Sequence, residues 1–505
     1  MSATTSPDRA PAKHPVDEIP PLTRLFPLGL QHVLALYAGA VAVPLIVGNA
    51  LKYSPQEIAY LISADLFVAG IASALQAIGF WRFGVRLPIM QGVTFAAVGP
   101  MLAIGKEYGI TTIFGSVIAC GIFMTLLAPF FAKILRFFPP LVTGTVILII
   151  GLSLMRVAAG WITGPVPSTG PKAGILPAAD PQKVAFAAGT LLLILLIEKF
   201  APAAIARVSV LVGLILGTIV AIPFGLANWD KVGNASWFAV PTPFHFGLPA
   251  FNVWAIISMC IVGLVIMTET TGDMIAVGEI CDSKVDPPRL ADGLRADGLS
   301  TILGGIFNTF PYTAFAQNVG LVSLTRVRSR YVCAMAGAIL LVMGLIPKIA
   351  AIVEGVPQSV LGGAGVALFG MVTASGVRSL SKVQFNEKNV LVVAISVGIA
   401  LIPTVNTNFY ANFPEAFKLL FDSGISAGAI AAILLNMIFN ADQLRGVTPG
   451  PSGPAHVPGT AYDGLRGPSN AAVVYTDDDG NEVVETVDRA RARQFVYDCQ
   501  HPDHQ

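Results

Sequence analysis

The sequence has few charged residues for its length. Only 12% of its 505 residues are charged, whereas 54% are hydrophobic and the mean hydropathy is +0.71. Soluble globular domains contain about 25% charged residues. The composition therefore excludes a soluble protein and indicates a chain that crosses a membrane several times. The formal net charge is only +1, so nothing indicates a nucleic-acid partner.

Cysteines are scarce, and their spacing indicates no metal or redox chemistry. The five are Cys120, Cys260, Cys281, Cys333 and Cys499. No CxxC pair occurs among them, so neither a disulfide framework nor a metal site is predicted. The sequence also has no cofactor fingerprint and no soluble catalytic domain, so an enzyme is not expected. The polar, proline-rich N-terminus lacks the apolar core of a signal peptide, and we expect a cytoplasmic tail over residues 1–26.

Long apolar segments are abundant instead. A membrane-spanning helix needs about 20 apolar residues, and about fourteen segments are candidates. They cover roughly residues 28–48, 55–80, 87–104, 110–132, 139–160, 182–202, 208–227, 251–278, 292–309, 311–325, 331–352, 359–379, 388–404 and 423–440. The polar region 441–505 is expected to be a cytoplasmic, partly disordered tail. Within it, AAVVYTDDDGNEVVETV could form a hairpin.

The distribution of positive charge predicts the orientation. An even number of spans places both termini on the same side of the membrane. Lys and Arg are more frequent in the loops that would share that side than in the opposite loops. The positive-inside rule therefore predicts that both termini are cytoplasmic.

Two of the candidate spans are unusual. The third reads LPIMQGVTFAAVGPML and the tenth reads PYTAFAQNVGLVSL; both contain a proline near the start, then a Phe-Ala pair, then Val-Gly. Each is third of seven in its half, and paired interrupted segments of this kind indicate a transporter binding site. We expect each to be extended first and helical afterwards, with N–H groups aimed into a cavity. The alternative is two proline-kinked helices without a ligand.

Acidic residues within spans are rare and usually functional. Glu269 and Asp273 are four residues apart in the eighth span and therefore share a helix face. Two such carboxylates resist ionising together, so at least one can hold a proton, unless neighbouring helices simply satisfy the pair. Asp297 begins the predicted ninth span, where it could instead favour a helix N-terminus. For Asp65 we expect a structural hydrogen bond.

Other polar residues accompany them. His32, after Gln31 in the first span, could support the site structurally or handle a proton directly. Phe95 could lay its ring on a planar ligand, and its neighbour Thr94 could form one hydrogen bond. Arg326 starts a basic cluster at the end of the tenth span, which could signal topology or influence an anionic substrate.

The run QNVGLVSLTR, residues 317–326, resembles the signature of the nucleobase–ascorbate transporters, or nucleobase:cation symporter family 2. The Gln31-His32 pair, Glu269 with Asp273, and Asp297 in ADG match further motifs of that family in the right order. The similarity extends over residues about 25 to 440, which leaves only the polar C-terminal tail outside it.

The resemblance implies an all-α fold of fourteen transmembrane segments in two inverted seven-span repeats. Spans 3 and 10 would each contribute a short strand and a half-helix. A core domain would take residues 27–132 and 251–352, and a gate domain would take 139–227 and 359–440. Members of the family are commonly homodimers in the lipid bilayer, joined through the gate domain, with an elevator-type mechanism.

The resemblance also implies roles for single residues. Glu269 looks like the acid that binds ring N–H groups, and Gln317 like the amide that reads the opposite edge of the ligand. Phe95 looks like the stacking ring, with backbone contacts from Thr94 and Ala316. A further set resembles residues needed for coupling or site geometry: Asp273, Asp297, His32 and Asn318. The ending Thr325-Arg326 is similar to that of urate and xanthine carriers.

These matches imply a plasma-membrane symporter that takes up uric acid with protons and needs no cofactor or metal. Uracil carriers usually have Glu at the position of Gln317, and vertebrate-type ascorbate carriers have Pro. Xanthine, or a broader purine and uracil range, remains the alternative substrate. A sulfate-type anion exchanger of the same architecture is disfavoured, because the C-terminal tail is short and those proteins lack the QN-x-G pattern. A channel would not need a paired proton-titratable site.

Overall fold

The computed structural model describes residues 14–164, 177–227, 229, 232–406, 408–441, 470–476 and 482–488. The chain up to Ala441 forms one compact helical unit, and the rest forms a second unit. In the second unit, β3 (Asn470–Thr476) and β4 (Glu482–Asp488) pair antiparallel. The predicted C-terminal hairpin is therefore confirmed, although residues 477–481 of its turn, Cys499 and the predicted disorder lie outside the described residues.

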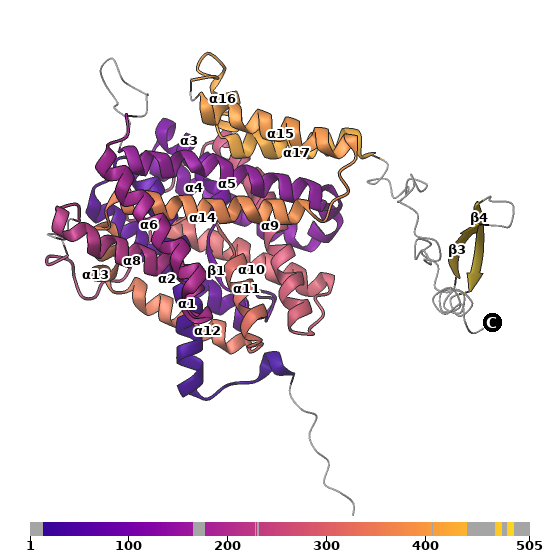
Figure 1. The fold of residues 1–505 in the computed structure, drawn as a ribbon, viewed down its shortest axis with the longest axis horizontal. Coiled ribbons are helices and arrows are strands. Elements are labelled where there is room, and N and C mark those ends of the chain that lie inside the picture. Colours follow the sequence, from indigo (N-terminus) through magenta and orange to yellow (C-terminus); the bar gives the residue numbers. More distant parts are fainter. Residues whose placement is uncertain are drawn as a thin grey trace, which may run out of the picture. The chain divides into compact units, whose positions relative to one another are not determined.

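The first unit consists mainly of helices (Figure 1). In the first half they are α1 (Leu22–Ala50), α2 (Pro55–Ile78), α3 (Val98–Tyr108), α4 (Ile110–Ile134), α5 (Pro140–Thr163), α6 (Pro181–Phe200), α7 (Ala203–Ala206) and α8 (Ser209–Ala221). In the second half they are α9 (Val253–Ile280), α10 (Pro287–Ile306), α11 (Ala316–Thr325), α12 (Arg330–Gly344), α13 (Pro347–Glu354), α14 (Gln358–Leu380), α15 (Glu387–Val405), α16 (Glu415–Phe421) and α17 (Gly424–Phe439). Helix α1 thus begins within the stretch predicted as the N-terminal tail.

Several helices are long and apolar enough to cross a membrane. Among the described residues there are seven of them, or up to nine if the bent pairs α12–α13 and α16–α17 are each one span. The bends are 80° and 82°. Helices α3, α8 and α11 have only 11, 13 and 10 residues, too few to span alone. The fold is therefore that of a multi-pass membrane protein, and the number fourteen stays a prediction.

The two interrupted segments meet through a pair of short strands. Strand β1 (Gln91–Val93) pairs antiparallel with β2 (Tyr312–Ala314), so that Gly92 lies opposite Thr313. All six residues of the two strands are buried. Irregular backbone at membrane depth is tolerated only where protein surrounds it or it lines a cavity. Here the two strands supply hydrogen-bond partners for each other's backbone groups.

Two further backbone hydrogen bonds extend this ladder. The Thr94 amide donates to the Pro311 carbonyl at 2.9 Å, and the Phe315 amide donates to the Met90 carbonyl at 3.0 Å. After each strand the chain becomes helical, through a 3₁₀ turn into α3 in the first half and directly into α11 in the second. As predicted, each segment is extended first and helical afterwards.

Helix packing follows the same pattern in both halves. Helix α2 packs on α12 as α10 packs on α4, and α1 packs on α12 as α9 packs on α4. Likewise α6 packs on α8 as α15 packs on α17. Two sets of helices result: a first helix group (α1–α4 and α9–α12) and a second helix group (α5, α6, α8, α14, α15 and α17), the latter built around the contact between α5 and α14.

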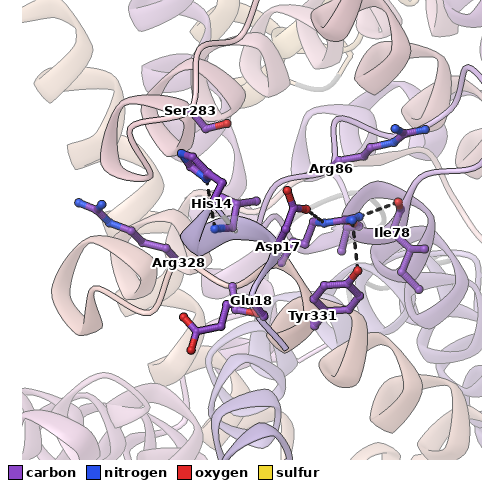
Figure 2. A network of polar contacts seen from close by, with 12 residues as sticks. His14, Asp17, Glu18, Ile78, Arg86, Ser283, Arg328 and Tyr331 are labelled. Carbon is purple, nitrogen blue, oxygen red and sulfur yellow. Dashed lines mark hydrogen bonds and ion pairs between the residues drawn. The ribbon is translucent and has the colours of Figure 1, made fainter. Parts of the chain in front are cut away.

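The residues before α1 are held against the ends of helices in the first helix group. The Arg330 guanidinium donates to an Asp17 carboxylate oxygen at 2.7 Å and to the Ile78 carbonyl at 2.8 Å. Figure 2 shows Asp17, Ile78 and Tyr331 close to one another, with dashed lines at each of them. Because the last carbonyls of a helix lack partners within it, Arg330 completes the C-terminus of α2. Arg330, one of the three arginines of the predicted basic cluster (Arg326, Arg328 and Arg330), therefore has a structural role. A second, Arg328, forms an ion pair with Asp282 at 2.6 Å.

Candidate functional site

Helix α9 lies directly beside the crossing of the two strands. The Thr270 hydroxyl accepts a hydrogen bond from the Ala314 amide at 3.1 Å, and it lies 3.2 Å from the Thr313 hydroxyl. Both contacts join α9 to β2. They hold Glu269, the preceding residue of α9, next to the point where the interrupted segments meet.

Glu269 and Asp273 lie one turn apart on α9, and both are only partly buried. Glu269 makes no side-chain hydrogen bond within the described part of the chain, and the Asp273 Oδ2 atom has no partner there either. The neighbouring Gly272 on α9 and Gly320 on α11 are exposed, and a Cβ at either would meet nothing within 4 Å. Helix α9 also packs against α11, so the two carboxylates lie on a helix that contacts the one carrying Gln317.

Asp297 lies in the interior of α10, ten residues after the helix begins at Pro287. The alternative of an acid favoured by a helix N-terminus is therefore wrong. Its side chain is 0% exposed, and its Oδ1 atom accepts hydrogen bonds from the side-chain amides of Gln76 and Gln91, both at 2.7 Å. Asp297 also lies within electrostatic range of Glu269 and Asp273.

The two amide residues at the start of α11 differ in their surroundings. Gln317 is exposed and makes no side-chain hydrogen bond among the described residues. Asn318 is buried, and its Nδ2 atom lies 3.0 Å from both the carbonyl oxygen and the Nδ1 atom of His32. A side-chain amide nitrogen can only donate, so Nδ2 of Asn318 donates both to the His32 carbonyl oxygen and to His32 Nδ1. This geometry matches the structural alternative for His32.

Thr94 and Phe95 precede α3. The Thr94 hydroxyl accepts from the Ala96 amide at 3.1 Å and caps the 3₁₀ turn, and its own amide is used by the strand ladder. The Phe95 ring meets the Phe369 ring of α14 edge-on, with centroids 5.7 Å apart. Phe95 therefore lies where the first helix group meets the second. Ala316, the first residue of α11, is exposed.

Thr325 and Arg326 lie at the far end of α11 from Gln317. An α-helix rises about 1.5 Å per residue, so roughly 12–14 Å separate their backbone positions from that of Gln317. The Thr325 hydroxyl donates to the Leu321 carbonyl at 2.8 Å, and Arg326 ends the helix in a left-handed conformation with φ 53°. The structure thus does not bring these two residues together with Glu269 and Gln317.

A second buried carboxylate supports strand β2 from the opposite side. The Tyr312 hydroxyl donates to Asp65 Oδ1 at 2.7 Å, and the Thr309 hydroxyl lies 3.1 Å from the same atom. The structural hydrogen bond predicted for Asp65 is therefore confirmed. Sequence reasoning missed Tyr312, Gln76 and Gln91, although polar side chains within apolar segments were a usable signal.

The site combines groups that suit a flat polar ligand. Two carboxylates on α9 and one amide on α11 have hydrogen-bonding capacity left, and Phe95 supplies an aromatic ring. The short helices α3 and α11 both begin at this level, where their first N–H groups lack helical partners and favour negative charge. The arrangement can therefore bind a heterocycle that carries both donors and acceptors.

Comparison with known proteins identifies relatives of this chain. Residues 23–409 match the family model described as "Permease family" (Xan_ur_permease). The uric acid transporter UacT of Escherichia coli is 44% identical over 453 residues, which are 88% of this chain and 92% of that protein. The nucleobase transporter PlUacP of Paenibacillus larvae is 45% identical over 84% of this chain and 96% of its own length. The xanthine permease of Bacillus subtilis is 44% identical over 82% and 93%.

Solved structures share the fold at low sequence identity. The transmembrane domain of the cyanobacterial bicarbonate transporter BicA has a TM-score of 0.58 at 17% identity, covering 79% of this chain and 98% of that domain. The murine Solute Carrier 26 family member A9 anion transporter, in its inward-facing state, has a TM-score of 0.55 at 12% identity, covering 83% and 68%. These similarities concern the architecture alone.

Proposed function

The chain belongs to the permease family, and on that premise we propose that it takes up uric acid across the cytoplasmic membrane in symport with protons. It is a membrane transporter and not an enzyme. Two of its relatives, UacT of Escherichia coli and PucJ of Bacillus subtilis, are named as a uric acid transporter and a uric acid permease. Their identities of 44% and 42% over more than four fifths of this chain support the proposal.

The observation that best supports a purine ligand is the pair Glu269 and Gln317. Their helices pack against each other, and neither side chain has a hydrogen-bond partner in the described residues. A carboxylate accepts from ring N–H groups, and an amide can both donate and accept. In this proposal the two residues hold opposite edges of the ring system, Phe95 covers its face, and the first residue of α11, Ala316, offers its backbone.

In this proposal, the three carboxylates near the ligand couple its transport to protons. Glu269, Asp273 and Asp297 lie within electrostatic range of one another in a membrane-buried setting, where three simultaneous negative charges are unfavourable. The ligand and a proton would therefore favour each other's binding. His32 and Asn318 keep the start of α11 in position in this scheme, and no metal or cofactor takes part.

Movement of one helix group against the other would provide alternating access. The first helix group would be the core domain that carries the site, and the second would be the gate domain. The matched packing of the two halves supports two inverted seven-span repeats, and each carries one interrupted segment. We extend this proposal to a homodimer joined through the gate domain, with both termini in the cytoplasm.

Xanthine is the second candidate substrate, because the xanthine permease of Bacillus subtilis is 44% identical to this chain. Thr94 would then help to set the substrate range through the shape of the turn before α3, since its amide and hydroxyl are already bonded. The bicarbonate and anion transporters of similar fold are too distant in sequence to suggest a substrate.

The test is uptake of radiolabelled urate by cells that express the protein, with and without a protonophore, and with unlabelled xanthine, uracil or ascorbate as competitors. We expect concentrative urate uptake that collapses with the protonophore and resists uracil. Gln317→Glu should abolish urate uptake or redirect the preference, whereas Gln384→Glu, in an exposed loop, should not. Unchanged urate affinity in Gln317→Glu would remove Gln317 from the site, and accumulation of xanthine without urate would replace the substrate.

A further inference from the structure

The segment 232–252, here called the strap, joins the second helix group to α9. It is tied to the ends of several helices of the first group. The Ala239 amide donates to the Leu345 carbonyl after α12 at 3.1 Å, and the Ala250 amide donates to Thr111 of α4 at 3.1 Å. The Tyr60 hydroxyl of α2 donates to the Thr242 carbonyl at 2.9 Å. Through these contacts the strap is attached to the first helix group.

A cavity of about 310 Å³ lies between the strap, the start of α2 and helix α13. It is separate from the site on α9 and α11. Its walls include Ala59 of α2, Ala239 and Pro241 of the strap, and Pro347 and Ala351 of α13. Ligand pockets typically measure about 300–1,000 Å³ and are mostly apolar with a few polar groups. The volume therefore suits one small molecule with a largely apolar body.

One polar group in the wall has an unmet hydrogen bond. Ser63 of α2 is 5% exposed, and its Oγ atom has no hydrogen-bond partner among the described residues. Serine in a helix often donates to the carbonyl four residues earlier, as the Thr112 and Ser116 hydroxyls do in α4, but Ser63 does not. Leaving a buried hydroxyl unpaired is unfavourable, so a ligand that bonds to it would be favoured.

The remaining wall residues narrow the class of ligand. The described lining contains no Lys, Arg or His but includes the carboxylate of Glu354, which already has a partner, so an anionic group would meet negative charge without a countercharge. Next to the cavity, Trp237 and Phe238 of the strap are 77% and 67% exposed, and exposed aromatic side chains are typical of the membrane interface. A neutral molecule that partitions into the bilayer is therefore the best match.

The cavity also lies where two of the three connections between the helix groups meet. Helix α13 belongs to the connection from α12 to α14, and the strap belongs to the connection from α8 to α9. The Lys348 ammonium of α13 donates to the Val232 carbonyl at 2.9 Å and lies 5.0 Å from the ring centroid of Trp237. A molecule bound in the cavity would restrict movement between the strap and α13.

We propose that the cavity beneath the strap binds a neutral, single-chain amphiphile from the bilayer, whose hydroxyl bonds to Ser63 and whose presence slows the relative movement of the helix groups. The binding is independent of the proposed function, and only the effect on transport rests on it. Occupancy would lower the maximal uptake rate without changing the apparent affinity for substrate, because the cavity does not share residues with the site on α9 and α11.

The test uses the purified full-length protein in lipid nanodiscs and a diazirine-bearing octanol as the photoreactive probe. Labelling should be saturable, should be displaced by unlabelled octanol, and should map to peptides that contain residues 55–63 or 347–354. Ala351→Trp, which fills the cavity, should reduce labelling at least tenfold. Ile352→Trp is the matched control, since Ile352 is 48% exposed on the same helix, and it should keep labelling within twofold.

A second variant covers the case in which Ala351→Trp does not fold. Ser63→Ala removes only the unpaired hydroxyl and should weaken octanol binding about two- to tenfold, the usual worth of one hydrogen bond. Non-saturable labelling, labelling confined to other helices, or unchanged affinity in Ser63→Ala would overturn the proposal. Labelling is also measured in Gln317→Glu, where it should persist, so that a failure of purine transport is distinguished from a failure of this site.

Discussion

The side-chain amide of Gln91 lies 2.7 Å from the Oδ1 atom of Asp297 and joins strand β1 to the middle of α10. The same oxygen also accepts from Gln76 of α2 at 2.7 Å, and the other oxygen, Oδ2, has no partner within the described residues. One buried carboxylate thus joins α10 to two elements, α2 and β1, whose contacting residues lie more than 200 residues earlier in the sequence. Asp297 is also within electrostatic range of Glu269 and Asp273.

Gln91→Leu should destabilise the protein and abolish uptake. The variant removes one of two donors to a buried carboxylate, and hydrogen bonds to charged groups contribute about 1.5–3 kcal/mol. The measurement is the thermal unfolding midpoint in detergent, together with substrate uptake at matched expression. Gln384→Leu, at an exposed position, serves as the control. An unchanged midpoint in Gln91→Leu would show that the contact with Asp297 is not structural.

His32→Gln should lower stability while keeping the pH dependence of uptake. In the structure His32 Nδ1 accepts a hydrogen bond from Asn318, so the ring is an acceptor at that atom and supports the start of α11. A double-mutant cycle with Asn318→Ala should give a coupling of about 0.6–1.7 kcal/mol, the range for polar pairs between membrane helices. A flattened pH profile in His32→Gln would instead identify His32 as the proton carrier.

Gly92→Ala should be destabilising because strand β1 has no room for a methyl group. A Cβ at Gly92 would lie 2.5 Å from the Phe315 ring, and overpacking of this kind costs about 1–3 kcal/mol. Phe315→Leu in the same chain should recover part of the loss, as judged from the unfolding midpoint. Gly160→Ala is the matched control, because nothing lies within 4 Å of a Cβ there. Equal effects of the two alanines would contradict the prediction.

Tyr312→Phe should destabilise the protein by removing the hydroxyl that donates to Asp65 at 2.7 Å. Both residues are fully buried, so Asp65 would keep only the bond from Thr309, and a loss of about 1–3 kcal/mol is expected. Tyr331→Phe, whose hydroxyl accepts from Arg330 in a partly exposed setting, should change the midpoint much less. If Tyr312→Phe is neutral, Asp65 does not depend on this bond.

Much of the fold follows from local patterns. Apolar length and scarce charge predict the membrane helices, and the paired prolines and Val-Gly steps predict the two interrupted segments. The hairpin near the C-terminus is predicted from AAVVYTDDDGNEVVETV, in which two apolar stretches flank an acidic one. Helix ends were less accurate: α10 begins at Pro287, before the apolar stretch, because Asp286 caps it and Pro287 is favoured at the first helical position.

The sequence by itself determined that this protein crosses a membrane, that it interrupts two spans, and that Glu269 and Gln317 are polar residues within apolar segments, because each depends on residue type and spacing along the chain. Only the tertiary structure decided which partner each buried polar group has. Gln76 and Gln91 meet Asp297, Asn318 meets His32, and Tyr312 meets Asp65 across more than 200 residues. Hydrogen bonds act over about 3 Å, so partners so far apart in sequence are assigned by the packing of helices and strands and not by local pattern.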